Sequence, residues 1–352
     1  MQEKRKKKLF TNRSIGFYKK QKIGNLLVVL FGLPFLLIGQ TLQKFEYAQP
    51  KMGTEFRLVF YTTDSIKANK AAEIAFQRID ALNQIFSDYE ASSELSRLSL
   101  SAGSGQKVQV SKELWEVLSM AQSISKKSKG AFDATIGPLT KIWRRAIRQN
   151  QFPDKMVLAA AKEKVCYKHL KLHPSTRSVS LTKEGMRLDL GGIAKGYTVD
   201  EVYKTLKEQG ITRALIDGGG DIYAGMPPPD SGAWKVIYIS KRTRTLSLDF
   251  FDPQSKTWTK RQENKKVVYL SNAAIASSGN TYKSLEIDGT KYSHIINPKT
   301  GLGLTHNDIL NVQSLTCALA DALASTVSVL SPKKGNRFLK KYIDTKLSEG
   351  VY

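Results

Sequence analysis

The first 43 residues constrain the whole chain, because a strongly basic start runs into a long stretch without charge. Residues 1–22 hold nine Lys and Arg against the single acid Glu3, a net charge of +8, and no charged residue occurs from Ile23 to Gln43. Such a run has about the 20 residues that span a bilayer, and a basic segment before a short apolar core is typical of an export signal. We therefore expect residues 1–43 to be a signal peptide or membrane anchor, and residues 44–352 to form one folded domain.

A buried core helix is the alternative for this stretch, but Gly24, Gly32 and Pro34 interrupt it and nine cations precede it. Lys and Arg stay on the cytoplasmic side during export. We therefore expect an exported protein on the extracytoplasmic, periplasmic side of the inner membrane, either tethered or secreted. No cysteine lies near the end of the apolar run, so we do not expect a lipoprotein.

The high net charge first suggests a nucleic-acid partner. The 352 residues carry a charge of +24, from 55 Lys and Arg against 31 Asp and Glu. The N-terminal +8 leaves +16, which is dispersed over the rest of the chain without interleaved aromatic residues. We expect no helix to carry a stripe of arginines, and we expect no nucleic-acid partner. A membrane-tethered nucleic-acid binder is kept as a distant alternative.

Helices and strands mix along the chain without a regular strand–helix–strand repeat. Apolar residues near helical spacing predict helices over 65–86, 111–127, 154–165, 196–209 and 314–330. Alternating or short apolar runs predict strands over 54–62, 179–181, 186–190, 214–217, 222–224, 234–239, 246–250, 267–275 and 282–296. This mixture predicts an α+β fold rather than a doubly wound parallel sheet.

A glycine-rich turn, Asp189–Gly196, follows one predicted strand and opens a predicted helix. Small residues let a ligand approach the backbone, and a helix N-terminus attracts phosphate. Lys195 would add a cation there, and Asp189 would accept hydrogen bonds from a base or a ribose. A tight turn with a surface lysine explains the same residues equally well.

Two other patterns point to chemistry. Asp321 and Ser325 lie four residues apart in an apolar predicted helix, so they share one face, and a carboxylate beside a hydroxyl suits a hard cation such as Mg²⁺. An Asp that is hydrogen-bonded inside a buried helix is the alternative. His294 ends a predicted strand and could act as a general base, since imidazole titrates near neutral pH. A structural histidine is the more common case.

Cys166, His169 and His173 resemble part of a zinc site in their spacing. Zinc sites normally take four ligands, and no second pair of ligands is available in this sequence. In a strand, Cys166 would also point to the face opposite the two histidines. We therefore expect no metal at these residues.

A set of short motifs occurs together and in a fixed order. The motifs are Met52–Thr54, Phe86–Glu90, Ser93–Ser96, Gly130–Leu139, Asp189–Gly196, Gly218–Asp221, Ser278–Gly279, His294–Gly301 and Ala320–Ser325. From about Phe45 to the C-terminus they resemble the ApbE family, the FAD:protein FMN transferases. Each motif is weak alone, whereas the whole set in register is specific. The resemblance implies an α+β fold with a T-fold-like core in an exported, commonly membrane-attached protein.

The resemblance also implies an activity and a site. Members bind FAD and Mg²⁺ and transfer FMN to a Thr or Ser hydroxyl of a partner protein while AMP leaves; the partner is expected to be a subunit of a membrane electron-transfer complex. The flavin contacts that it implies are Met52, Tyr89, Ala131, Phe132, Asp133, Asp189, Lys195 and Ile296. The metal ligands that it implies are Asp321, Ser325 and the backbone carbonyl near Gly192. His294 is the candidate base in this scheme.

The chain departs from the family pattern at three points. Ser325 stands where the family often has Thr, and because a hydroxyl remains, metal binding should survive. Asn280 replaces the usual Asp after Ser-Gly. The acceptor cysteine of the lipoprotein members is absent, so attachment would depend on residues 1–43. An FAD-binding protein or FAD pyrophosphatase that needs no acceptor would use the same site, and it is the alternative function.

Overall fold

The structure, a computed structural model, describes residues 41–239, 265–279, 284–306, 308–342 and 346–348. Nearly all of the expected signal or anchor segment, the predicted strand over 246–250 and Asn280 lie outside these ranges. Within them, no helix combines the length and the apolar character that a membrane crossing requires.

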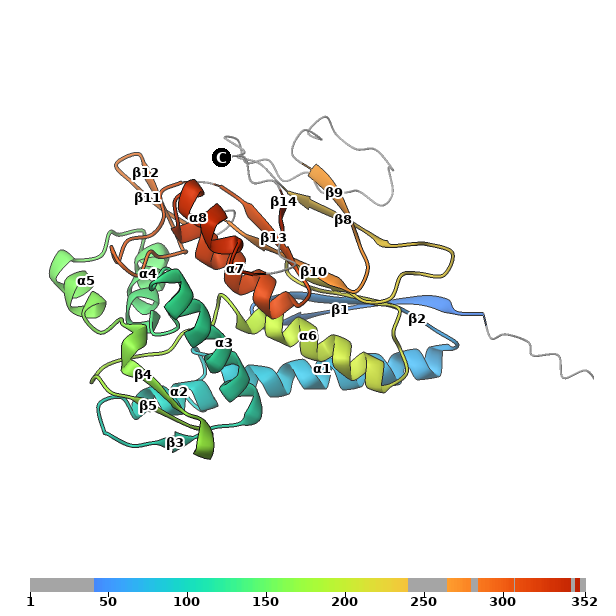
Figure 1. The fold of residues 1–352 in the computed structure, drawn as a ribbon, viewed down its shortest axis with the longest axis horizontal. Helices are drawn as coiled ribbons and strands as arrows, with labels where there is room; N and C mark the ends of the chain where they lie inside the picture. Colours follow the sequence, from blue (N-terminus) through green and yellow to red (C-terminus); the bar gives the residue numbers. More distant parts are fainter. Residues whose placement is uncertain (1–40, 240–264, 280–283, 307, 343–345, 349–352) are drawn as a thin grey trace, which may run out of the picture. The chain divides into compact units, whose positions relative to one another are not determined.

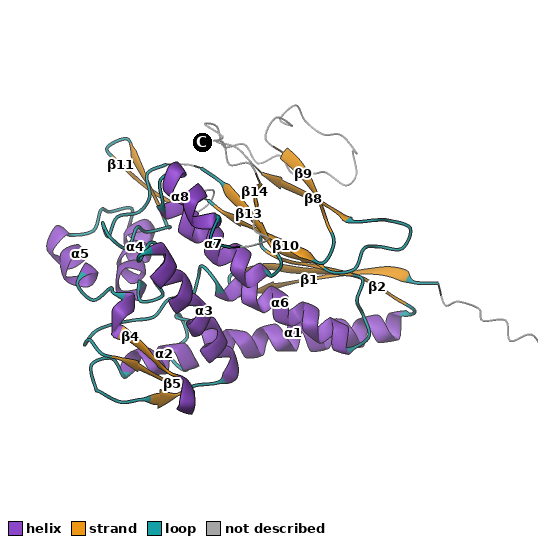
Figure 2. Cartoon of the chain, viewed as in Figure 1, coloured by secondary structure: helices purple, strands orange, loops and turns teal. Residues whose placement is uncertain are grey.

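An antiparallel sheet of seven strands forms the centre of the described fold (Figures 1 and 2). In spatial order its strands are β1 (Gln43–Lys51), β2 (Thr54–Thr62), β6 (Ala214–Gly218), β7 (Asp221–Ala224), β10 (Ala273–Ser278), β13 (Leu310–Ser314) and β14 (Lys346–Ser348). Because β2 pairs directly with β6, the chain leaves the sheet over residues 63–213 and returns beside the strand that it left.

Three helices cover one face of this sheet: α1 (Ser65–Phe86), α6 (Ala194–Glu208) and α7 (Cys317–Val329) (Figure 1). Asp64 starts α1 by accepting a hydrogen bond from the Lys67 N–H at 2.8 Å. The buried side of α1 is rich in alanine, which lets the helix pack closely on the apolar side chains of β2.

The opposite face of the sheet is covered by a hairpin of β8 (Trp234–Ile239) and β9 (Lys265–Leu270). Trp234 and Leu270 of the hairpin share a buried cluster with Ile222 and Ile275 of the sheet. The central strands of the sheet are therefore covered on both faces, whereas most of β1 is exposed.

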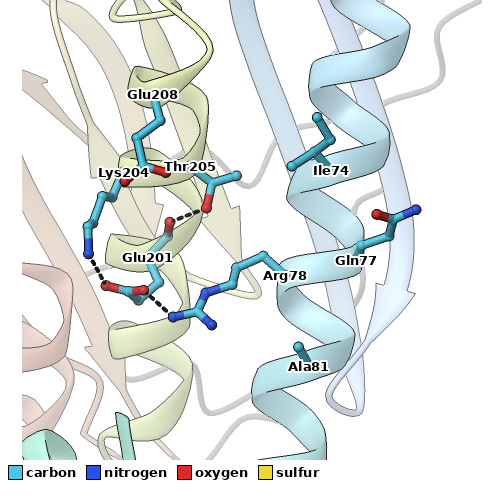
Figure 3. A pocket seen from close by; sticks show the side chains of 8 residues that line it. All are labelled: Ile74, Gln77, Arg78, Ala81, Glu201, Lys204, Thr205 and Glu208. Atoms are coloured by element: carbon cyan, nitrogen blue, oxygen red, sulfur yellow. Dashed lines mark hydrogen bonds and ion pairs between the residues drawn. The ribbon is translucent and has the colours of Figure 1, made fainter. Parts of the chain in front are cut away.

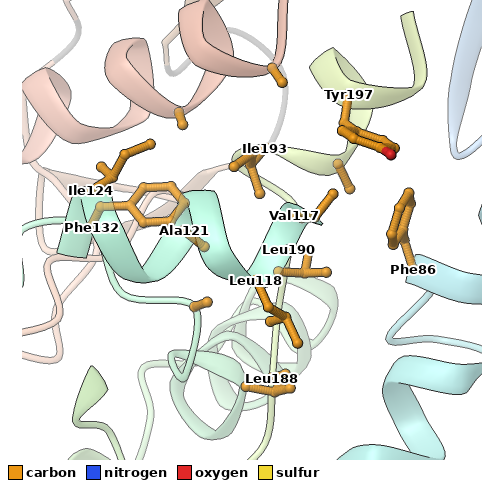
Figure 4. Close-up of a cluster of buried hydrophobic side chains, with 14 of the residues drawn as sticks. Phe86, Val117, Leu118, Ala121, Ile124, Phe132, Leu188, Leu190, Ile193 and Tyr197 are labelled. Carbon is orange, nitrogen blue, oxygen red and sulfur yellow. The ribbon is translucent and has the colours of Figure 1, made fainter. Parts of the chain in front are cut away.

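The excursion between β2 and β6 builds a second layer around α7. It contains α2 (Glu94–Leu100), α3 (Lys112–Ser128), α4 (Gly137–Gln149), α5 (Lys155–Lys162), the 3₁₀ turns η1 (Tyr167–His169) and η2 (Pro174–Thr176), and a small sheet of β3 (Val108–Gln109), β5 (Ser178–Leu181) and β4 (Leu170–His173). Figure 4 shows side chains of its core, where Phe132 and Leu190 approach α3. A further cluster joins α4 and α5 to the hairpin of β11 (Ser284–Ile287) and β12 (Thr290–Ser293), and α8 (Pro332–Leu339) follows α7.

The strand predicted over 267–275 is divided at Ser271 and Asn272 between β9 and β10, which belong to different sheets. Two other sequence expectations about local structure are wrong. Residues 186–190 form no strand; Met186, Leu188 and Leu190 are buried in an irregular segment, which is held by a hydrogen bond from the Asp189 N–H to the Ala134 carbonyl at 2.9 Å. The apolar residues of this segment are therefore buried without forming a strand, and Asp189 between them is buried as well.

The second wrong expectation is that no helix carries an arginine stripe. The helix α4 was not predicted, and its Lys141, Arg144, Arg145 and Arg148 recur at intervals of three and four residues, so they follow one face. The α+β class itself agrees with the mixture of helices and antiparallel sheets.

Candidate functional site

The helices α6 and α7 cross at very short range. A Cβ on Gly196 would lie 2.4 Å from the Cys317 carbonyl oxygen, so only glycine fits there. Each helix also donates first-turn N–H groups to a carboxylate of the other. Asp200 of α6 accepts from the N–H groups of Cys317 and Ala318 at 2.8 and 2.9 Å, and Asp321 of α7 accepts from the Gly196 N–H at 3.3 Å. The two helix starts are thus joined by reciprocal caps.

The three predicted metal ligands gather at this crossing. Asp321 is 5% exposed, and Ser325 follows one turn later on the same face of α7. A Cβ on Gly192 would lie 2.9 Å from the Ser325 Oγ, so the Gly192 backbone lies against that hydroxyl. No group of three or more His, Cys, Asp or Glu side chains suited to a metal occurs within the described ranges. A cation here would instead use one carboxylate, a hydroxyl, a backbone oxygen and water, all of which are oxygen ligands that Mg²⁺ accepts.

A buried ion pair lies beside Asp321. The Lys195 ammonium pairs with Asp221, which is 1% exposed. Burial lowers the pKa of Lys195, but the charges of Asp221 and Asp321 outweigh this and leave its pKa above the ordinary value. Burial and the nearby Asp221 raise the pKa of Asp321 to about 7, against the opposing charge of Lys195. Asp221 and Asp321 thus share the single ammonium of Lys195. Because one negative charge is left without a partner, the site is suited to bind a cation.

We expect Lys195→Met to reduce the free energy of unfolding by about 3 kcal/mol, because it leaves the buried Asp221 carboxylate without its partner. The double variant Lys195→Met with Asp221→Asn removes both charges and should recover at least half of that loss. Urea unfolding of both variants measures the difference. A double variant as unstable as the single one would show that the loss has another cause.

A second charged group connects two of the predicted flavin contacts. Arg144 pairs with Asp88 and, through Nη2, with the Asp189 Oδ2 at 2.9 Å. Its guanidinium carbon also lies 4.3 Å from the centroid of the Tyr89 ring. The other oxygen of Asp189 accepts the Gly191 N–H at 2.7 Å, which shapes the turn before α6. Arg144 therefore holds Tyr89 and Asp189 together.

The predicted contacts Ala131, Phe132 and Asp133 form a buried turn. The Phe132 ring lies 3.4 Å from the position of a Cβ on Gly192, so this turn borders the candidate metal ligands. Asp133 accepts the backbone N–H groups of Thr135 and Tyr167 at 2.9 and 2.8 Å, and burial raises its pKa. The Asp133 carboxylate thus fixes the shape of the turn.

The other predicted residues lie in different parts of the fold. Met52 occupies the turn between β1 and β2 with φ 49° and packs against two core clusters. Ile296 is buried with Leu139 and Trp143 in the cluster beneath α4, and His294 two residues earlier is exposed. Ile296 thus belongs to the part of the fold built around α4, rather than to the crossing of α6 and α7.

Sequence reasoning missed three residues that organise the site: Arg144, Asp200 and the role of Asp221 as the partner of Lys195. Asp221 did carry a signal, because an acidic residue directly after three glycines at the start of a buried strand needs a partner. Arg144 and Asp200 carried no such signal in the sequence, since each contacts a segment that is far from it along the chain.

The histidines of the rejected zinc pattern bond to hydroxyl groups. The His169 Nδ1 lies 3.0 Å from the Thr182 Oγ1, and the His173 Nε2 lies 2.9 Å from the Ser180 Oγ. Both contacts fasten β4 to the strand beside it.

A groove of about 440 Å³ between α1 and α6 does not coincide with the predicted site (Figure 3). Its lining residues are Ile74, Gln77, Arg78, Ala81, Glu201, Lys204, Thr205 and Glu208. Arg78 pairs there with Glu201 and, at 2.9 Å, with Glu113. We interpret the groove as a solvated seam between two helices that this ion-pair network holds together.

The chain was compared with known proteins. A protein named FAD:protein FMN transferase from Treponema pallidum is 28% identical over 330 residues, 91% of this chain and 88% of that protein. One of the same name from Escherichia coli (strain K12) is 27% identical over 295 residues, 82% of this chain and 79% of that protein. The sequence matches the ApbE family over residues 52–347.

Solved structures give the same fold. The flavin transferase ApbE from Vibrio cholerae superimposes with a TM-score of 0.72 at 23% identity and covers 88% of this chain and 98% of that chain. The apo form of the Pseudomonas stutzeri flavinyl transferase ApbE gives a TM-score of 0.70 at 23% identity, over 85% and 89%. These superpositions confirm the predicted α+β class, and the sequence match shows that the chain belongs to the ApbE family.

Proposed function

We propose that this chain is an FAD:protein FMN transferase, the name carried by its curated relatives. The observation that carries the proposal is the cluster at the crossing of α6 and α7. There the buried Asp321, the Lys195–Asp221 pair and the first turn of α6 lie together. A site of this kind suits a dinucleotide phosphate bound together with a cation.

In the proposed reaction, a Thr or Ser hydroxyl of an acceptor protein attacks the FMN-side phosphorus of FAD. A new oxygen–phosphorus bond forms to the acceptor, the pyrophosphate bond breaks, and AMP leaves with the bridging oxygen. The hydroxyl proton passes to a base, for which the exposed His294 is the candidate.

The roles of the residues follow from their positions. Asp321, Ser325 and the Gly192 carbonyl would hold Mg²⁺, which when bound neutralises charge on the pyrophosphate. Lys195, in the first turn of α6, would bind the phosphate oxygens and help to hold the dinucleotide in line with the attacking hydroxyl. Among the flavin contacts that the resemblance implies, Met52, Tyr89 and Phe132 supply apolar and aromatic surface for the rings of FAD.

The proposed setting is extracytoplasmic. Export through residues 1–43 would leave the enzyme tethered to the inner membrane or secreted beyond it. An acceptor that is a subunit of a membrane electron-transfer complex would then meet the enzyme on the same side of that membrane.

The test has two steps. The acceptor is first identified as the protein whose covalent flavin fluorescence on a denaturing gel disappears in cells lacking this chain. The purified full chain is then mixed with that acceptor, FAD and Mg²⁺. We expect the acceptor to gain the mass of one FMN while one AMP is released, and EDTA to abolish both.

Two results would contradict the proposal. If no adduct forms although FAD binds, the chain is not a transferase. If AMP and free FMN appear without an acceptor and at an unchanged rate, the chain is an FAD pyrophosphatase.

A further inference from the structure

The cationic face of α4 places three exposed cations beside Arg144, whose charge is balanced by Asp88 and Asp189. Lys141, Arg144, Arg145 and Arg148 follow one side of the helix, and the segment Gly137–Gln149 contains no Asp or Glu. Like charges three and four residues apart destabilise a helix. Such a stripe is therefore expected only where another interaction requires it.

The opposite side of α4 shows what the helix needs for packing. Leu139, Trp143 and Ala146 are buried in the cluster shared with α5 and the β11–β12 hairpin. Because this apolar side is buried within the domain, α4 presents no apolar surface that could insert into a bilayer. The cationic face is the part of α4 that remains open to a partner.

The stripe is connected to the candidate site through Arg144. That residue pairs with Asp88 and Asp189 and lies on the ring of Tyr89, whereas Lys141, Arg145 and Arg148 are exposed. Burial raises the pKa of Tyr89, and Arg144 and Arg148 oppose this rise. The Arg144 contact places the stripe beside Tyr89, which is 69% exposed.

We propose that the exposed part of this stripe, Lys141, Arg145 and Arg148, is the docking surface for an acidic segment of the acceptor protein. The inference rests on the proposed function, because it assigns a partner surface to that same site. Exposed cations are too strongly screened to fix a small ligand, but several of them together steer and orient a macromolecule. An acidic segment lying along α4 would bring the neighbouring acceptor hydroxyl to the rim formed by Tyr89.

The test uses the double charge reversal Lys141→Glu with Arg145→Glu. These positions are separated by four residues and make no contact with the candidate ligands; Arg145 bonds to Gln149 at 3.2 Å. The matched control is Lys333→Glu with Arg337→Glu, an exposed Lys and Arg four residues apart on α8. The α4 variant gains attractive pairs with Arg144 and Arg148, so its melting temperature should not fall.

We expect the α4 variant to raise the KM for the acceptor by about tenfold at low salt, with a smaller effect at high salt. Its kcat at saturating acceptor and its FAD affinity should stay within about twofold of the wild type, as should all three values for the α8 control.

Three outcomes would overturn the proposal. An unchanged KM for the acceptor would show that the stripe is not the docking surface. A weakened FAD affinity would show that the stripe binds the nucleotide instead. An equal rise in KM for the α8 control would show that the effect comes from the net charge of the protein rather than from α4. If the α4 variant instead loses binding to phosphatidylglycerol vesicles with the acceptor KM unchanged, the stripe is a membrane contact. Failure of the wild type to modify any acceptor would contradict the transferase proposal itself and is therefore distinguishable.

Discussion

Asp321→Asn is expected to slow FMN transfer by about 10²–10³-fold. The substitution keeps the size of the side chain and an oxygen that can accept the Gly196 N–H, but it removes the charge that would hold Mg²⁺. A bound cation contributes several kcal/mol to such a transition state, and each 1.36 kcal/mol changes the rate about tenfold. The initial rate of AMP release with a saturating acceptor measures the loss, and calorimetric titration of Mg²⁺ in the presence of FAD should show weakened metal binding.

A matched control for this variant is Asp217→Asn. Asp217 is also a carboxylate whose pKa is raised by burial, and it also accepts a glycine N–H, that of Gly220, at 2.8 Å. It is not a candidate ligand, so its variant should retain transfer within about fivefold of the wild type. Full activity of Asp321→Asn, or an equal loss of activity in Asp217→Asn, would show that Asp321 is not a metal ligand.

Gly196→Ala is expected to lower both the stability of the protein and its transfer activity. The new Cβ would lie 2.4 Å from the Cys317 carbonyl oxygen and 2.9 Å from the Ala318 Cα, and both are backbone atoms of a packed helix that cannot turn away. Overpacking of this kind lowers the free energy of unfolding by about 1–3 kcal/mol. The higher helix propensity of alanine offsets part of this loss. We expect the melting temperature to fall by roughly 5–10 °C and transfer to be largely lost, since α6 must move away from Asp321.

Gly232→Ala provides the comparison for Gly196→Ala. Nothing lies within 4 Å of a Cβ built on Gly232, and its backbone is not in the left-handed region. Differential scanning calorimetry should find its melting temperature within about 1 °C of the wild type. If Gly196→Ala is equally harmless, α6 and α7 can separate without loss, and the close crossing is not required.

The sequence predicted those features that depend on neighbours along the chain. The helix over 65–86 was recovered with its limits, because apolar spacing is a local signal. Asp321 and Ser325 were placed on one helix face for the same reason. The approach of Gly192 to Ser325 came only from the family resemblance, since no spacing rule relates residues on separate segments.

The sequence failed where tertiary contacts decide the structure. Helix α4 has Ile136 at its N-cap and therefore no side-chain cap. Pro138 in its first turn was the one start signal, and the helix and its arginine stripe went unrecognised. The alternation in residues 186–190 did reflect burial, but the segment bonds to the Ala134 carbonyl instead of to a neighbouring strand. The pair of Lys195 and Asp221 joins residues 26 apart, a separation from which no pattern predicts contact.

The reciprocal caps at the crossing of α6 and α7 have a consequence for motion. Opening the first turn of either helix strips hydrogen bonds from a carboxylate that the other helix supplies, so neither start can fray alone. The amides of Gly196, Cys317 and Ala318 should therefore exchange with solvent deuterium as one cooperative unit. A nucleotide or cation that binds between them would slow all three together, and the protection of these amides would report how tightly the site is closed.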